Sequence, residues 1–338
     1  MVESTRIVLA SRPVGAPTPE NFRIETVELP APAEGEVLLR TRYLSLDPYM
    51  RGRMSAAKSY AEPVEIGAVM VGATVAEVLE SRDPSVAKGD VVLAYSGWQT
   101  HDVAPARGVR KLDPAAAPVS TALGVLGMPG FTAYAGLREI GKPRPGETLV
   151  VAAATGPVGS AVGQIAKLGG TRAVGIAGGP RKVAYLSELG FDVALDHRAP
   201  DFAEQLAAAV PDGIDVYFEN VGGAVADAVY PLLNTYARVP VCGLIANYNA
   251  VGAPEGPDRL AGFYGRILTK SLTVRGFIQT EFVRALYPDF LREMGDWVAD
   301  GRVRYREDVV SGLAAAPEAF IGMLEGRNFG KVVVRVAE

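Results

Sequence analysis

The chain has 338 residues, a formal net charge of −4 and 49% hydrophobic residues. This length predicts two domains, because domains usually run about 100–200 residues, and it allows a core that needs no metal or disulfide for stability. The small net charge, with both signs interspersed, argues against nucleic acid or an anionic membrane as the main partner. No apolar run reaches the roughly 18–20 residues that span a bilayer. The N-terminus lacks the pattern of a signal peptide, so we expect a cytoplasmic protein.

Residue types that bind transition metals are scarce. The chain has one cysteine, Cys242, and two histidines, His101 and His197. One cysteine excludes an intrachain disulfide, and a catalytic zinc site needs three well-placed protein ligands. Such a site would use every cysteine and histidine of the chain, so no metal is expected.

The first part of the chain consists of short apolar runs separated by Gly and Pro. The runs 36–46, 67–79 and 90–95 are typical of strands in an antiparallel or barrel-like domain. Near the other end, 306–313 and 331–336 again have the pattern of strands, which predicts that the chain returns to the first domain. The predicted limits are 1–126 with 301–338 for the first domain and 127–300 for the second.

From about Thr148 the pattern changes to buried apolar strands that alternate with amphipathic helices, which is typical of βαβ units and a parallel sheet. The predicted strands are 148–154, 172–177, 193–197, 214–220, 238–244 and 273–278. The predicted helices are 159–169, 180–189, 201–209, 223–234 and 258–269. Six such strands predict a complete doubly wound sheet. Pro240 cannot donate to a ladder, so either it begins its strand or a neighbouring carbonyl lacks its usual donor.

A glycine-rich turn follows the first strand of this second domain. It reads Ala154-Thr155-Gly156-Pro157-Val158-Gly159-Ser160, a G-x-G-x-x-G fingerprint with Ala in the first position. Glycines let the backbone turn tightly and let a pyrophosphate approach the helix N-terminus, where N–H groups and the helix dipole favour negative charge. Such turns can also serve only helix packing, but the βαβ context favours a dinucleotide-binding Rossmann domain.

The end of the second strand indicates which dinucleotide is bound. NAD sites usually carry an acidic residue about 20 residues past the glycines, on the ribose hydroxyls. Here no acidic residue occurs from Thr148 to Ser187, and Gly178-Gly179-Pro180 is followed by Arg181 and Lys182. Cations without a nearby acid suit a ribose 2′-phosphate. Basic residues at a helix start also oppose the helix dipole, which disfavours a purely structural role. NADP is therefore predicted.

Five stretches in order along the chain resemble the prostaglandin reductase and leukotriene hydroxydehydrogenase group, which includes plant alkenal double-bond reductases and bacterial curcumin-reductase-like enzymes. The stretches are Leu46–Arg51, Gly127–Tyr134, Phe218–Gly223, Cys242–Asn249 and Gly326–Lys331. The resemblance implies a zinc-independent medium-chain reductase, a homodimer, with a GroES-like β-rich catalytic domain and a doubly wound Rossmann domain, α/β overall. It implies NADPH-dependent reduction of the carbon–carbon double bond of α,β-unsaturated aldehydes and ketones.

The resemblance also assigns residues to the site. Tyr248 matches the tyrosine that acts on the substrate carbonyl, and Tyr49 lies in the substrate-side loop. The implied cofactor-binding residues are Met128, Thr132, Gly156, Pro157, Val158, Gly159, Ser160, Arg181, Lys182, His197, Asn220, Cys242, Gly243, Leu244, Ile245, Tyr248, Phe277 and Asn328.

This chain departs from the family pattern at a few positions. His197 replaces a tyrosine, Thr155 and Pro157 replace smaller residues of the turn, and Ala246 stands where a serine is common. A histidine still can hydrogen-bond a phosphate, whereas Ala246 makes the nicotinamide side less polar.

The implied reaction has a simple electrostatic requirement. Hydride addition to the β-carbon of an enone places charge on the carbonyl oxygen, which a hydrogen-bond donor such as the Tyr248 phenol stabilises. The ribose hydroxyl of the cofactor is an alternative donor. Two other functions stay open from the sequence: an NADPH:quinone oxidoreductase and a non-catalytic NADPH-binding protein.

Overall fold

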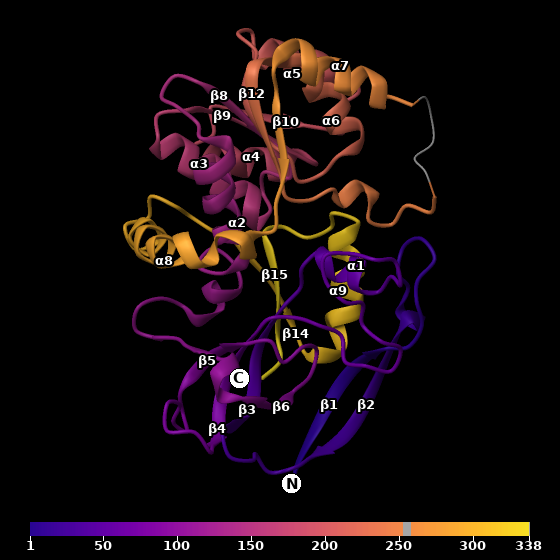
Figure 1. The fold of residues 1–338 in the computed structure, drawn as a ribbon, viewed down its shortest axis with the longest axis vertical. Helices are drawn as coiled ribbons and strands as arrows, with labels where there is room; N and C mark the ends of the chain where they lie inside the picture. Colours follow the sequence, from indigo (N-terminus) through magenta and orange to yellow (C-terminus); the bar gives the residue numbers. More distant parts are fainter. Residues whose placement is uncertain (253–257, 338) are drawn as a thin grey trace. The chain divides into compact units, whose positions relative to one another are not determined.

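The computed structural model describes residues 1–252 and 258–337, and the chain divides into two compact units. Unit 1 consists of Met1–Gly124 and the chain from Glu307 onward, and unit 2 is Val125–Arg306. The sequence patterns place the corresponding limits after residues 126 and 300. Figure 1 shows the elements of both units, coloured along the chain.

Unit 1 is built mainly from antiparallel β-structure. Within the described residues, its larger sheet has seven strands in the order β14-β15-β3-β4-β5-β7, with β6 paired to β3, and β1 pairs with β2. The strands are β1 Val2–Leu9, β2 Phe22–Leu29, β3 Glu36–Ser45, β4 Thr74–Ser81, β5 Val91–Ala94, β6 His101–Pro105, β7 Arg110–Lys111, β14 Glu307–Ser311 and β15 Lys331–Arg335. The antiparallel pairing of β15 with β3 confirms the predicted return of the chain.

Short helices and an aromatic cluster complete unit 1. The helices are η1 Pro19–Asn21, α1 Tyr49–Arg53, η2 Ala106–Gly108, η3 Val119–Leu123, η8 Leu313–Ala315 and α9 Ala316–Leu324. Phe22 stacks on the fully buried Trp98 at a centroid distance of 5.5 Å, and Phe320 of α9 packs edge-on against Trp98 at 5.7 Å. These rings join segments from both ends of the sequence into one core.

A buried ion pair joins two of the stretches that carry the family resemblance. The Lys331 ammonium donates to Asp47 Oδ1 and to the Leu46 carbonyl, each at 2.6 Å, and both charged side chains are at most 5% exposed. Ser45 donates to the other carboxylate oxygen of Asp47. Burial lowers the pKa of Lys331, while the Asp47 carboxylate opposes that change. The pair therefore fixes the loop that carries Tyr49 to strand β15.

Unit 2 contains a parallel sheet that, over the described residues, has six strands in the order β10-β9-β8-β11-β12-β13. The strands are β8 Thr148–Val151, β9 Arg172–Ala177, β10 Val193–Asp196, β11 Ile214–Phe218, β12 Leu233–Val241 and β13 Thr273–Gly276. In chain order this is 3-2-1-4-5-6, the order of a doubly wound Rossmann sheet, and it confirms the predicted fold class. Successive strands are added on one side of β8 as far as β10 and then on its other side from β11 to β13.

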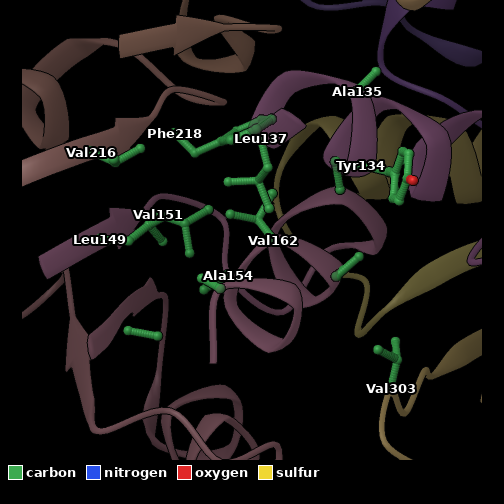
Figure 2. Packing of buried hydrophobic residues seen from close by; sticks show 14 of the residues in the cluster. Tyr134, Ala135, Leu137, Leu149, Val151, Ala154, Val162, Val216, Phe218 and Val303 are labelled. Carbon is green, nitrogen blue, oxygen red and sulfur yellow. The ribbon is translucent and has the colours of Figure 1, made fainter. Parts of the chain in front are cut away.

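Helices cover both faces of this sheet. They are α2 Met128–Gly136, η4 Leu137–Gly141, α3 Pro157–Leu168, α4 Pro180–Glu188, α5 Phe202–Ala209, α6 Gly223–Val229, η5 Tyr230–Leu232, η6 Ile245–Asn247, α7 Leu260–Lys270, η7 Gln279–Phe282 and α8 Val283–Ala299. Successive residues of β8 point to opposite faces. Leu149 and Val151 pack in the cluster with α2, α3 and α8 (Figure 2), whereas Val150 packs with α5, α6 and α7.

The structure corrects three details of the prediction. The helix predicted over 223–234 ends at Val229, because Pro231 turns the chain into a 3-10 helix and the buried Leu233 already begins β12. Pro240 does not begin its strand but is its next-to-last residue, and its carbonyl accepts from the Glu219 amide at 2.9 Å. The sequence patterns also did not predict α2 and α8.

The Asp47–Lys331 pair generates a stability prediction. Lys331→Met leaves a buried carboxylate without its cation, so the free energy of unfolding of unit 1 should fall by about 3–5 kcal/mol. The tryptophans at 98 and 297 lie in different units. Denaturant unfolding followed by Trp98 fluorescence, with Trp297→Phe in all variants, therefore reports on unit 1.

A matched control in the same unit is Arg82→Gln, which removes an exposed arginine 3.6 Å from Glu80. Exposed pairs are worth at most about 1 kcal/mol. A loss no larger for Lys331→Met than for Arg82→Gln would contradict a stabilising role for the buried pair.

Candidate functional site

The glycine-rich turn lies between the end of β8 and the start of α3. Ala153 has a left-handed φ of +50°, and Gly156 is the residue before the helix. A Cβ on Gly159 would lie 2.4 Å from the Ala153 carbonyl oxygen, so only glycine lets the helix come this close to the turn. The first amides of α3 have no acceptor within the helix and point out of its N-terminus. The turn thus has the form that accepts a diphosphate.

The end of β9 leads through Gly178 and Gly179 into α4, which has Arg181 and Lys182 in its first turn. No acidic residue occurs in the sequence from Thr148 to Ser187, but one lies close to this turn in space. Asp196, the last residue of the neighbouring β10, accepts a hydrogen bond from the Gly179 amide at 3.0 Å. A carboxylate therefore lies at the turn that leads into α4, because a parallel neighbour brings its own strand end to the same edge.

His197 lies beside the same turn. A Cβ on Gly178 would be only 2.7 Å from its Nε2 atom. Burial lowers the pKa of His197, and the charges of Arg198 and Lys182 lower it further, while Asp196 opposes them. The imidazole is thus predominantly neutral at pH 7 in the absence of an added anion. The structure brings together the predicted residues Lys182 and His197, and it adds Arg198 and Asp196, which the sequence analysis did not identify.

Glu219 organises the loop after β11 and is fully buried. Its Oε1 accepts from the Val221 amide at 2.7 Å, the Gly222 amide at 2.9 Å and the Tyr217 hydroxyl at 3.0 Å. Its backbone carbonyl accepts from the Cys242 amide at 3.1 Å. The sequence analysis missed this role, although a carboxylate that directly follows an apolar strand is a signal, since a buried charge needs partners.

Asn220 lies where the ends of β8 and β11 meet. Its side-chain amide donates to the Ala152 carbonyl at 2.8 Å, and its Oδ1 accepts from the Cys242 thiol at 2.8 Å. Burial, together with the Glu219 charge, raises the pKa of Cys242 well above its usual range. The predicted residues Asn220 and Cys242 are therefore in direct contact, next to the glycine-rich turn, at the position where doubly wound sheets bind ligands.

The segment that carries Tyr248 is hydrogen-bonded to the Glu219 loop. The Ile245 amide donates to the Asn220 carbonyl at 3.3 Å, and the Ala246 amide donates to the Val221 carbonyl at 3.0 Å. Tyr248 directly follows η6, and the Leu244 amide lies 3.4 Å from its hydroxyl oxygen. Tyr248 as a whole residue is half-buried.

Three further predicted residues lie in unit 2. Met128 is the first residue of α2, and the Thr132 hydroxyl donates to its carbonyl at 2.8 Å. Phe277 directly follows β13, is 6% exposed and packs edge-on against Phe218 at 6.3 Å. In this conformation Thr132 and Phe277 are engaged with their own unit.

The two remaining predicted residues lie in unit 1. Tyr49 begins α1, and burial and the Asp47 charge raise its pKa above its ordinary value, so its hydroxyl stays protonated at neutral pH. Asn328 lies in the loop before β15 and donates through its side-chain amide to the Gly330 carbonyl at 2.9 Å. Both loops are anchored by the Asp47–Lys331 pair.

Over residues 1–252 and 258–337, no group of three or more His, Cys, Asp or Glu side chains is arranged to hold a metal ion. The same residues contain no helix long and apolar enough to cross a membrane.

Two family models match the chain. The N-terminal domain of oxidoreductases matches residues 5–112, and the zinc-binding dehydrogenase model matches residues 157–296. The zinc in the second description does not fit this chain, because the described residues offer no set of ligands for it. The matched range runs from the start of α3 into α8, all within unit 2.

Individual proteins are similar to this chain over its whole length. The NADPH-dependent curcumin reductase of Escherichia coli is 59% identical, over 98% of this chain and 96% of that protein. Prostaglandin reductase 1 of Rattus norvegicus is 43% identical, over 99% of this chain and all of that protein. The crystal structure of CurA from Vibrio vulnificus in complex with NADPH superposes with a TM-score of 0.95, at 55% identity, and covers 99% of each chain.

These similarities extend over both units and include all five of the stretches singled out in the sequence. The chain belongs to the medium-chain reductase family that includes curcumin reductase, prostaglandin reductase and 2-alkenal reductase.

Proposed function

We propose that this protein is an NADPH-dependent reductase that saturates the carbon–carbon double bond of α,β-unsaturated aldehydes and ketones. The observation that carries the proposal is the Cys242–Tyr248 segment, which is hydrogen-bonded beside the glycine-rich turn and ends with the half-buried Tyr248. Membership of a family of NADPH-dependent reductases supports it.

NADPH fits the residues at the carboxyl ends of β8 and β9. The bare turn at Gly156–Ser160 suits the diphosphate, and Lys182 in the first turn of α4 suits the 2′-phosphate. Asn220 and the segment from Cys242 onward lie beyond the diphosphate turn, on the side where the nicotinamide belongs. When bound, NADPH supplies the hydride that reduces the double bond.

The residues of the chain stabilise the charge that forms when the hydride is added, and a proton from water then completes the reduction at the α-carbon. As the β-carbon is reduced, negative charge develops on the substrate carbonyl oxygen, and a preorganised donor stabilises it. The Tyr248 hydroxyl is the donor we assign to that oxygen, and its oxygen can go on accepting from the Leu244 amide while the O–H is donated. Tyr49 is assigned to the substrate side, where its raised pKa keeps it a neutral donor.

A quinone oxidoreductase is the second candidate function. Its support is weaker, since the similarity to a solved quinone oxidoreductase of Pseudomonas syringae is 21% identity with a TM-score of 0.76, which shows the fold alone. A non-catalytic NADPH-binding protein has no specific support. NADPH consumption with an enone, with a quinone or with neither distinguishes the three functions.

The cofactor assignment predicts that Lys182→Ala raises the KM for NADPH about ten- to a hundredfold, because a charge-assisted contact to phosphate is lost. The KM for NADH should stay nearly unchanged. Lys88→Ala, which removes an exposed lysine from a turn of unit 1, is the matched control and should affect neither cofactor. Equal changes for NADPH and NADH would refute the assignment.

The absence of a donor set predicts that chelators and added zinc leave the reaction rate unchanged, since a catalytic zinc needs three protein ligands. Metal analysis of the purified, active protein checks this directly. Stoichiometric zinc, or loss of activity after chelation that zinc restores, would overturn the assignment.

The role of Tyr248 predicts that Tyr248→Phe lowers turnover with an enone by about 10²–10³, since losing one oxyanion donor costs about 2.7–4 kcal/mol. NADPH affinity should barely change. Tyr236→Phe, which removes the hydroxyl of a 70% exposed tyrosine in β12, is the control. A loss of only about tenfold would assign most of the stabilisation to the ribose hydroxyl of the cofactor, and an unchanged rate would exclude the proposed role.

A further inference from the structure

One carboxylate joins the ends of β9 and β10. Asp196 Oδ1 accepts from the Gly179 amide at 3.0 Å and from the Arg198 amide at 2.9 Å. These amides are among the causes that lower the pKa of Asp196, so the group is ionised at neutral pH. The backbone of Arg198 is thereby held against the turn that precedes α4.

The side chain of Arg198 lies over the same turn. A Cβ on Gly178 would be 3.0 Å from Arg198 Nε, and a Cβ on Gly179 would be 3.7 Å from its Nη1. His197 covers Gly178 in the same way, with Nε2 at 2.7 Å from that position. Bare backbone at both glycines therefore leaves room for a guanidinium and an imidazole, and Arg198 itself remains exposed to solvent.

Two cations converge on His197. Arg198 and Lys182 are both among the charges that lower the pKa of this imidazole. They come from different elements, since Lys182 is in the first turn of α4 and Arg198 follows β10. Cations brought together in this way repel each other, and a dianion between them removes the repulsion.

We propose that Arg198 binds the 2′-phosphate of the dinucleotide directly, together with Lys182, and so contributes to the choice of NADPH over NADH. The proposal rests on the proposed use of NADPH. A guanidinium presents several N–H donors in a planar fork that matches phosphate oxygens, whereas the Lys182 ammonium is a single point of charge. Arg198 would thus add orientation as well as charge.

Binding of adenosine 2′,5′-bisphosphate and of adenosine 5′-monophosphate, measured by calorimetry on the full chain, tests the proposal without catalysis. Arg198→Gln should weaken binding of the bisphosphate about ten- to a hundredfold and change binding of the monophosphate less than about twofold. Arg284→Gln, at an exposed arginine of α8, should change neither. Equal weakening of both ligands, or none for the bisphosphate, overturns the role of Arg198.

The same measurement on the unaltered chain separates this inference from the cofactor assignment. If the unaltered chain does not prefer the bisphosphate, then the proposed use of NADPH fails and the Arg198 proposal fails with it. If the preference exists and Arg198→Gln keeps it, only the Arg198 proposal fails.

A second readout comes from the imidazole. The chain has only two histidines, so proton NMR can follow the pKa of His197 separately. Arg198→Gln should raise that pKa in the absence of ligand, because one of the charges that lower it is gone. Binding of the bisphosphate should raise the pKa in the unaltered chain. An unchanged pKa in Arg198→Gln would show that the guanidinium does not lie beside the imidazole and would overturn the proposal.

Discussion

The buried carboxylate of Glu219 is the constraint on which the site end of the parallel sheet depends. Its side chain folds the loop after β11 back on itself through the amides of Val221 and Gly222, and its backbone carbonyl holds the end of β12 through Cys242. A buried charge is tolerated only when its acceptor positions are filled, so the loop has little freedom to adopt another shape. This loop fixes the position of Asn220, and its hydrogen bonds to the Ile245 and Ala246 amides fix the Tyr248 segment. The geometry of the proposed nicotinamide side is therefore set by a residue that need not touch any ligand.

The proposed dinucleotide site recognises the two ends of the cofactor by different kinds of group. At the diphosphate turn the recognition groups are backbone amides and a helix N-terminus, which carry no titratable charge and are fixed by Gly159 and Ala153. At the adenosine end the groups are side chains, with Lys182, His197 and Arg198 gathered around two glycines. The backbone amides of the diphosphate turn are insensitive to pH, and they suit a diphosphate that both dinucleotides contain. The side chains at the adenosine end act through their charge, so they are the groups that can distinguish NADPH from NADH.

The sequence predicted the parts of the fold that depend on local pattern. The strand-to-helix turn at Gly156–Ser160, the strands of the doubly wound sheet and the return of the chain to unit 1 all follow from apolar periodicity and glycine position. The early start of β12 was not predictable, since it depends on burial of Leu233 and the turn at Pro231. Asp196 and Arg198 were missed because parallel pairing brings residues about 20 positions apart to one edge. These residues are distant in the sequence, and only the register of β9 against β10 shows that they are neighbours in space.

The single cysteine raises a chemical problem that the structure resolves. The proposed substrates, α,β-unsaturated carbonyl compounds, are electrophiles that react with thiolates, and Cys242 lies in the segment that leads to Tyr248. The thiolate is the reactive form, so reactivity follows the fraction that is ionised. Here burial and the nearby Glu219 charge raise the pKa of Cys242, and the thiol donates a hydrogen bond to Asn220 Oδ1 at 2.8 Å. The interaction that orients Asn220 thus also keeps the sulfur protonated, because ionisation would remove the donor and place a second negative charge near Glu219. One buried carboxylate therefore shapes the proposed nicotinamide side of the site and suppresses the nucleophile that lies within it.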